Sequence, residues 1–212
     1  MCDFHADDAV LTPLADDEYA LDSTHVRRFV AAVRERIGQS DSPEEACRLL
    51  GPLLSDLLAD RDWLPLHFQE PAAESGMGGG IGQWLIFRSA DRSLSLFSLV
   101  VPPGAMTPVH DHLAWGLVGV YRGGQDEEFY RPLPGSGLEL TRRRPLSPGD
   151  FYALLPPIDD VHRVRTTSPE TSVSIHLLAN DTGCVWRHTY DEQTGEARPF
   201  RSGYVNAHCE SA

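Results

Sequence analysis

The sequence predicts a mainly β protein, built as a closed or double-sheet β architecture with N-terminal helices packed outside it. The first observation is a series of short segments of alternating polarity after residue 82, separated by Gly, Pro and Asp. Such segments are typical of antiparallel sandwiches and barrels. The second observation is helical periodicity over residues 23–58, which places an amphipathic helical region before the strands.

Composition and charge narrow the class of protein. The chain has 212 residues, of which 41% are hydrophobic and 23% charged, as in an ordinary globular domain with a buried core. Its formal net charge of -13 disfavours nucleic acid and anionic membranes as partners. No run approaches the roughly 18 apolar residues of a membrane span, and the start lacks the regions of a signal peptide. We therefore expect a cytoplasmic monomer or homodimer.

The cysteines do not suggest a metal or redox motif. Their spacing does not match zinc knuckles or redox pairs, so we expect free thiols in a reducing compartment. The four positions are Cys2, Cys47, Cys184 and Cys209.

Three regions follow one another along the chain. Residues 1–21 are acidic and aperiodic, and we expect an N-terminal arm. Residues 22–70 form the predicted helical segment, and a loop rich in Gly, Ala and Ser follows it. Residues 82–206 form the predicted β-barrel domain.

The first predicted helix begins at Ser23 or Thr24, either of which can cap it, and ends at Gly38. Its apolar residues recur at helical spacing and are Val26, Phe29, Val30, Val33 and Ile37.

The second predicted helix begins with Ser42-Pro43-Glu44-Glu45, which supplies a cap, a first-turn proline and acids that suit the helix dipole. Gly51-Pro52 lies inside the pattern, and we expect a break or kink there because proline removes a helical hydrogen bond. Core packing is the favoured role of the leucine stripe, with partner binding as the alternative. The apolar face comprises Ala46, Leu49, Leu50, Leu53, Leu54, Leu57 and Leu58.

The predicted strands alternate in polarity and are bounded by turn residues. They occupy residues 83–88, 94–101, 115–121, 127–133, 138–142, 151–155, 162–166, 172–178 and 185–190.

Two histidines stand where chemistry is expected. In an extended chain, residues two apart point to one face, so His110 and His112 can direct their imidazoles at one point. A metal site needs a third ligand, and His162 is a candidate; it lies after Ser147-Pro-Gly-Asp and the apolar run 151–155. Neutral imidazole suits Zn, Cu, Fe and Ni, and the spacing does not select among them.

The glycines around these histidines carry a resemblance. Gly104, His110, His112, Gly116 and Gly123 stand at the spacings of the first cupin motif, with Gly116 where many cupins carry a glutamate ligand. The second cupin motif resembles the stretch that contains Pro148, Gly149, Asp150, Pro156, Pro157 and His162. The resemblance implies a double-stranded β-helix, also called a jelly-roll barrel.

Without the glutamate, the three histidines are similar to those of the thiol dioxygenase branch of the cupins. That branch includes cysteine dioxygenase and, more similar to this chain, the bacterial 3-mercaptopropionate dioxygenases. The resemblance implies Fe(II) held by His110, His112 and His162, with its +2 charge uncompensated by protein. It further implies a small thiol substrate, O₂ as the second substrate and a sulfinate product. Leu117 stands where some cysteine dioxygenases carry a cross-linked cysteine, so no cross-link is expected.

A late strand carries a second part of the resemblance. Thiol dioxygenases have a Ser-x-His-x-Tyr relay there, and this chain has Ser174 and His176, with Leu178 in place of the tyrosine. The partner of His176 is then expected to be either an ordered water in the space of the missing phenol or a hydroxyl from Tyr152 or Tyr204. The alternative is a buried Ser174–His176 pair in which each side chain satisfies the other.

Substrate contacts are also implied. Arg187 lies nine residues after Leu178, where mercaptopropionate dioxygenases carry the arginine that receives the substrate carboxylate. The alternatives are a solvated arginine or one paired with Asp191. Gln83 and Arg88 are further possible contacts. The tail 195–204 resembles the end segment of bacterial thiol dioxygenases and is expected to lie across the barrel mouth.

A different class stays open at this point. Three histidines and a water also satisfy catalytic Zn²⁺, and cupins include isomerases and sensors that bind small ligands without catalysis. The sequence therefore predicts either a thiol dioxygenase or another metalloprotein, such as a zinc isomerase, a hydrolase or a sensor.

Overall fold

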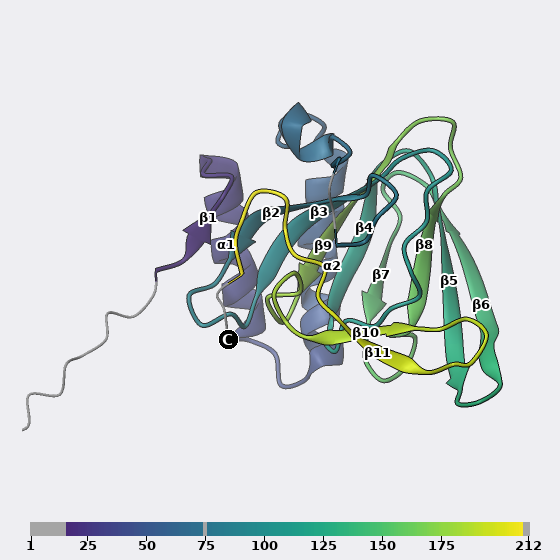
Figure 1. The fold of residues 1–212 in the computed structure, drawn as a ribbon. Helices are drawn as coiled ribbons and strands as arrows, with labels where there is room; N and C mark the ends of the chain where they lie inside the picture. Colours follow the sequence, from purple (N-terminus) through teal and green to yellow (C-terminus); the bar gives the residue numbers. More distant parts are fainter. Residues whose placement is uncertain (1–15, 74–75, 210–212) are drawn as a thin grey trace, which may run out of the picture.

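The computed structural model describes residues 16–73 and 76–209 of the chain. Two sheets curve around a common interior (Figure 1). The larger is antiparallel with the strand order β1(Glu18–Tyr19), β2(Gly82–Arg88), β3(Ser95–Val101), β9(Ser172–Leu178), β4(Gly116–Arg122), β7(Phe151–Leu154). Facing it are the triplet β6(Gly137–Leu146), β5(Gln125–Leu133), β8(His162–Thr166) and the pair β10(Arg187–Tyr190), β11(Ala197–Phe200).

An extended segment joins the triplet to the pair. Residues 106–111 precede β4, and His110 within them forms isolated β-bridges to both His162 of β8 and Thr189 of β10. The backbone of Tyr190 also donates to the Val109 carbonyl. The segment therefore acts as a strand between β8 and β10, although regular strand structure begins only at Gly116.

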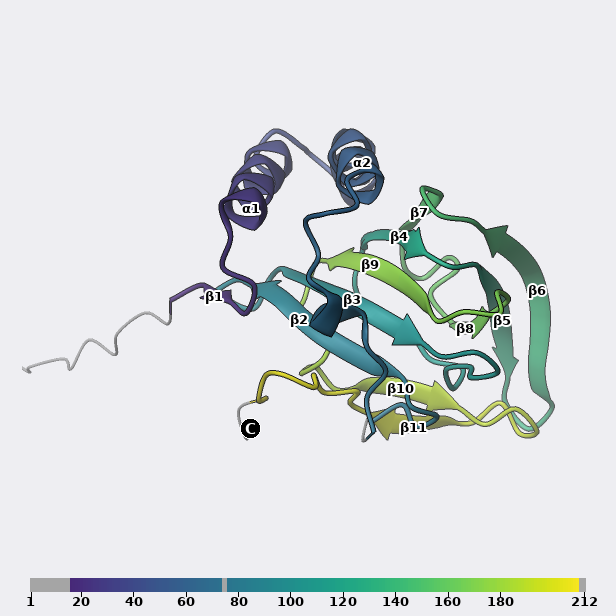
Figure 2. The same cartoon turned by 90° about the horizontal axis from the view of Figure 1, so that it is seen from above.

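The two faces of the large sheet bury different side chains. On the outer face, which Figure 2 shows covered by α1 and α2, the helices pack on a core that includes Ile86, Leu96, Leu117, Ile175 and Leu177. The inner face alternates with it and lines the barrel with Phe97, Val118, Tyr152, Leu154 and Leu178.

Both helices form as predicted. Helix α1 spans Thr24–Ile37, and the Ser23 side chain accepts a hydrogen bond from the Val26 backbone. Helix α2 spans Pro43–Ala59 with Ser42 as its cap.

Of the expected break or kink at Pro52, the break is wrong, because α2 continues through that residue. Pro52 and Arg48, whose carbonyl loses its helical donor, are both exposed, so water can satisfy that carbonyl. Burial of Leu50, Leu54 and Leu58 against the sheet offsets the cost of about 3 kcal/mol that proline imposes.

Each predicted strand is confirmed, with shifted ends in some. Strands β8 and β9 have the predicted bounds, whereas β6 runs longer, to Leu146, and β10 begins later, at Arg187. The short helical turn η1(Leu66–Gln69) and strands β1 and β11 were not predicted.

Part of the predicted arm belongs to the sheet. Glu18 pairs with Arg88 and Tyr19 with Phe87, whose ring centroid lies 4.8 Å from that of Tyr19. Residues 16–21 are thus attached to β2, while the expectation for residues 1–15 lies outside the described residues.

The prediction of free cysteines was wrong for two positions. Cys184 and Cys209 form a disulfide although they are 25 residues apart in the sequence. No short sequence motif predicts a pairing over that separation. The bond becomes possible because the C-terminal segment folds back along β2, where the Val205 backbone donates to the Gln83 carbonyl. Cys47 is free and buried, and burial raises its pKa to about 11. Cys2 lies outside the described residues.

Within residues 16–73 and 76–209, none of the helices combines the length and the apolar character that crossing a membrane requires.

The packing of α2 yields a stability prediction. Leu54 is 0% exposed in the core between the helices and the sheet, so Leu54→Ala should lower the free energy of unfolding by about 2 to 5 kcal/mol. Leu66→Ala, at a position 72% exposed, is the control and should change it by less than about 0.5 kcal/mol. Urea titration measures both, and equal losses would contradict this packing.

Candidate metal centre

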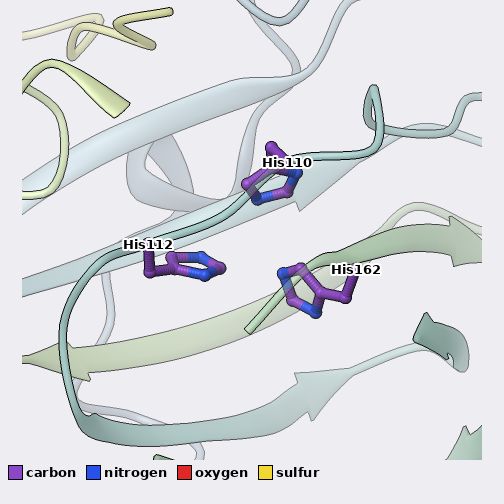
Figure 3. Close-up of side chains that lie close together, drawn as sticks. All are labelled: His110, His112 and His162. Carbon is purple, nitrogen blue, oxygen red and sulfur yellow. The ribbon is translucent and has the colours of Figure 1, made fainter. Parts of the chain in front are cut away.

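Three imidazoles converge inside the barrel. The ring centroids of His110, His112 and His162 are separated by 4.9, 4.8 and 4.8 Å, which is nearly an equilateral triangle. One ligand atom of each residue lies within 4.8 Å of the other two. Figure 3 shows the three rings pointing toward one another. His110 lies in the 106–111 segment, His112 directly follows that segment, and His162 begins β8. The arrangement can hold one metal ion.

Asp111 fixes the position of the two histidines that flank it. Its carboxylate accepts hydrogen bonds from the His188 backbone at 2.7 Å and from the Tyr190 hydroxyl at 2.9 Å. Its carbonyl accepts a bond of 2.7 Å from Arg187. The side chain and the backbone of Asp111 therefore both form hydrogen bonds with residues of β10.

Each histidine has an outer neighbour on Nδ1. His110 Nδ1 donates to the Pro108 carbonyl at 2.9 Å. His112 Nδ1 lies 3.6 Å from Asp160 Oδ1, and His162 Nδ1 lies 2.9 Å from Glu127 Oε2. Metal-binding histidines commonly have such partners, which direct the other ring nitrogen toward the metal.

The protonation of the site suits a metal. Burial, reinforced by His162 and Arg187, holds the pKa values of His110 and His112 well below the usual 6.5. Both imidazoles are therefore neutral at pH 7, as metal ligation requires. His162 Nε2 is buried without a hydrogen-bond partner among the described residues, and a metal ion would supply one. The donor set thus fits a divalent transition metal.

A carboxylate ligand at position 116 is excluded by packing. A Cβ atom added to Gly116 would collide with the Leu177 carbonyl oxygen and lie 2.7 Å from Leu178 Cδ2. Gly116 therefore accommodates the neighbouring strand β9, and a glutamate could not replace it without moving that strand.

The expectation of an uncompensated metal charge was wrong. Two buried carboxylates lie behind the histidines: Asp160 behind His112 and Glu127 behind His162. Sequence reasoning missed both. Asp160 lies two residues before His162. In an extended chain, residues two apart point to the same face, and this rule, which pairs His110 with His112, also predicts that Asp160 lies on the same side as His162. Glu127 lies within the run Asp126-Glu127-Glu128, and a run of acidic residues usually indicates a solvent-exposed surface.

The predicted Ser174–His176 pair is present on the inner face. Ser174 Oγ lies 3.0 Å from His176 Nε2, and the His176 ring stacks on Phe97 with centroids 4.7 Å apart. The centroid of His112 is 6.4 Å away. Burial lowers the pKa of His176 to about 3, so this imidazole is neutral.

Neither expected tyrosine supplies a hydroxyl to His176. The Tyr152 hydroxyl lies 3.3 Å from His162 Nδ1 instead. The Tyr204 hydroxyl donates to Asp181 and accepts from the Gly183 backbone. His176 Nδ1 is therefore buried without a hydrogen-bond partner in the described part of the chain, and the apolar Leu178 follows two residues later.

Arg187 is buried beside the histidines and is 1% exposed. Its hydrogen bonds go to uncharged oxygens of Asp111, Thr182 and Ser202. Burial lowers its pKa to about 10. Both alternatives for this residue were wrong, because it is not solvated and Asp191 pairs with Arg198 instead.

The two further candidates on β2 differ. Gln83 is 3% exposed, and neither polar atom of its side chain has a partner among the described residues. Its position in the register, opposite Leu99, places it on the inner face. Arg88 is committed to ion pairs with Glu18 and Asp181.

No family model matches the chain. It is similar to an oxalate decarboxylase from Lactobacillus farciminis in a formate complex, at 15% identity and a TM-score of 0.40, over 51% of this chain and 31% of that one. It is also similar to the Cupin_2 domain of an XRE family transcriptional regulator from Enterobacter cloacae, at 19% identity and a TM-score of 0.35. That match covers 46% of this chain and 94% of the other. An uncharacterized protein with a double-stranded β-helix domain from Klebsiella pneumoniae matches at 13% identity and a TM-score of 0.43. This match covers 58% of this chain and 88% of that chain.

These solved structures include cupin and double-stranded β-helix proteins. The matched region of the oxalate decarboxylase is under a third of that chain, at 31%. The predicted mainly β class with external helices is confirmed by the sheets and helices of the structure.

The converging imidazoles predict one metal ion per chain. Replacing His110, His112 and His162 together by alanine should abolish metal binding, because no other histidine, cysteine or carboxylate side chains converge in this way within residues 16–73 and 76–209. Metal content after loading and dialysis measures this, with circular dichroism to confirm folding. His67→Ala, which removes an exposed histidine, is the control. Full metal content in the triple variant would place the site elsewhere.

The neutral histidines predict a pH dependence for the metal-free protein. His110, His112 and His176 have folded pKa values below the unfolded value of about 6.5, so the unfolded chain binds more protons below that pH. Stability should therefore fall from pH 6.5 to pH 5, by up to about 1.4 kcal/mol per pH unit for each histidine.

Urea titrations at several pH values measure that slope. His176→Gln should reduce it by one histidine's share. Burial raises the pKa of Asp160, which acts in the opposite direction, whereas Arg163, against the effect of burial, lowers the pKa of Glu128, which acts in the same direction as the histidines. The difference between the wild type and His176→Gln therefore isolates the contribution of that histidine. A stability that stays constant across this range would contradict neutral, buried imidazoles.

Proposed function

We propose that the protein is a non-haem Fe(II) dioxygenase that uses O₂ to oxidise the sulfur of a small thiol-bearing acid to a sulfinate. The observation that carries the proposal is Arg187, a buried cation whose hydrogen bonds go to uncharged oxygens, beside three histidines that suit a metal. The motif resemblance supplies the thiol, because three histidines without a glutamate are similar to those of thiol dioxygenases.

Arg187 is suited to receive the carboxylate of the substrate. A guanidinium has five N–H donors, and the three hydrogen bonds of Arg187 leave two of them for a ligand. Its buried charge favours an anion. Gln83 supplies a further uncommitted donor on the barrel interior. An acid bound there would have its other end near the histidines, whose pKa values Arg187 influences.

The remaining inner residues control protons and water. Ser174 holds His176 through Nε2, which leaves the neutral Nδ1 available to a ligand. Leu178 and Phe97 give this part of the interior an apolar lining. When bound, Fe(II) would bring thiolate and O₂ together, and one thiolate with one O₂ gives one sulfinate with no other product.

An oxygen electrode tests the proposal directly. Fe(II)-loaded protein should consume O₂ with a small thiol acid, and one sulfinate should form for each O₂. Acids without sulfur are the matched negative substrates. Protein that retains zinc and binds acids without consuming O₂ would overturn the proposal in favour of a zinc isomerase, a hydrolase or a sensor.

The role of Arg187 predicts a substrate-binding defect. Arg187→Ala should raise KM strongly and lower kcat/KM by about 2 to 4 kcal/mol in transition-state free energy, because a buried carboxylate loses its partner. Since Arg187 also holds the Asp111 carbonyl, rates must be compared at matched iron content. Arg198→Ala, at an exposed arginine, is the control. Unchanged kinetics would remove Arg187 from the site.

Leu178 predicts a change of substrate preference. Leu178→Tyr restores the family hydroxyl two residues after His176 and should shift activity from other thiol acids toward 3-mercaptopropionate. The extra volume in a fully buried position should cost about 1 to 3 kcal/mol of stability. Oxygen uptake on 3-mercaptopropionate and cysteine measures the preference. A folded, iron-loaded variant with the wild-type ratio would show that position 178 does not select the substrate.

A further inference from the structure

A glutamate is buried inside the barrel behind one metal ligand. Glu127 is 0% exposed, and strand register pairs it with Val164 while pairing Phe129 with His162. Glu127 is therefore a diagonal neighbour of His162 on the inner face. Its Oε2 lies 2.9 Å from His162 Nδ1, a separation that a hydrogen bond can span.

The carboxylate lacks an arginine to balance it. Among the described side chains, His162 Nδ1 is the basic atom within ion-pair distance of Glu127, and the Tyr152 hydroxyl is the other polar neighbour of the carboxylate. A buried carboxylate without a counter-ion is costly. A divalent cation bound to the far nitrogen of His162 would supply the missing positive charge across a single imidazole ring.

The same geometry selects the tautomer of His162. A carboxylate only accepts hydrogen bonds, so a proton on His162 must lie on Nδ1 to face Glu127. The Nε2 atom, which is buried and unpartnered, then has its lone pair free for a metal. The Tyr152 hydroxyl lies 3.3 Å from the same Nδ1 and can accept its proton or donate to the carboxylate.

We propose that Glu127 is a positioning residue of the metal centre, which holds His162 with Nε2 toward the metal and places a negative charge behind that ligand. The inference rests on the three-histidine site and requires neither a thiol substrate nor O₂. A purely structural glutamate would behave differently, because its removal would destabilise the metal-free fold and leave metal affinity unchanged.

Cobalt(II) is a suitable probe because its visible spectrum reports the ligand geometry. Glu127→Gln should weaken Co²⁺ binding about 10- to 100-fold and shift the visible absorption band. The stability of the metal-free protein should be unchanged or increased, because the substitution removes an unbalanced buried charge. Titration with Co²⁺ against a competing chelator and urea unfolding of the metal-free protein measure the two effects. Wild-type affinity with a wild-type spectrum in Glu127→Gln would overturn the proposal.

The neighbouring residue provides a matched control. Glu128 faces the outside of the same strand, where Arg143 Nε and Arg163 Nε each donate to it at 3.0 Å. Glu128→Gln makes the same chemical change and the same charge change one residue away. It should lower stability but leave Co²⁺ affinity and spectrum as in the wild type. An equal loss of affinity in both variants would overturn a specific role for Glu127.

A measurement on the wild type keeps the proposal testable even if Glu127→Gln does not fold. In Zn²⁺-loaded protein, nitrogen NMR of the histidine rings should show His162 with a proton on Nδ1 and zinc on Nε2. Zinc on Nδ1 would overturn the proposal. These binding assays use no thiol, so their outcome is separate from that of the oxygen-uptake experiment.

Discussion

Hydrogen bonding of the 106–111 segment between β8 and β10 is the constraint on which the metal centre depends. His110 is bridged to His162 on one side and to Thr189 on the other, which sets the spacing of two ligands through the backbone. Asp111 then fixes the third, because its carboxylate and carbonyl are both bound by residues of β10. Backbone pairing and the contacts of Asp111 thus set the positions of all three histidines, as a well-defined metal site requires.

Charge is distributed unevenly around this triangle of histidines. The carboxylates of Glu127 and Asp160 lie behind two of the ligands, where they favour a cation at the centre. Arg187 lies beside the same ligands with its hydrogen bonds directed to neutral oxygens, so it favours an anion. Under the proposed function, a metal and an acidic ligand would therefore have separate, complementary places.

Sequence predicted the elements whose signals are local. The bounds of β8 and β9 follow from strict alternation between turn residues, and the helix starts follow from Ser23 and Ser42. Strand β11 was missed because its four residues include a proline and lie mostly exposed. The helix continues through Pro52 because burial of the leucines around it outweighs the local loss of a hydrogen bond, and a local sequence pattern does not contain that tertiary contribution.

The candidate site was predictable only where spacing encodes it. The three histidines were found from motif spacing, and their convergence is what the structure adds. Glu127 and Glu128 are adjacent and identical in type, yet one faces the metal ligands and the other an arginine pair. Only the register of β5 against β8 separates them, and a shift of one residue would exchange their roles.

The helix-covered face of the large sheet explains how the fold tolerates a polar interior. The outer face of the large sheet and the two helices bury a continuous apolar core, with residues such as Leu50, Leu54 and Ile175 fully inaccessible. The barrel interior, which the second sheet also lines, instead carries buried polar atoms on Gln83, Glu127 and His176 that have no well-aligned hydrogen-bond partner among the described residues. Each such group costs about 1 to 3 kcal/mol. Because the helix-covered face supplies apolar burial independently, the barrel interior can retain groups that destabilise the protein until a metal and a ligand satisfy them.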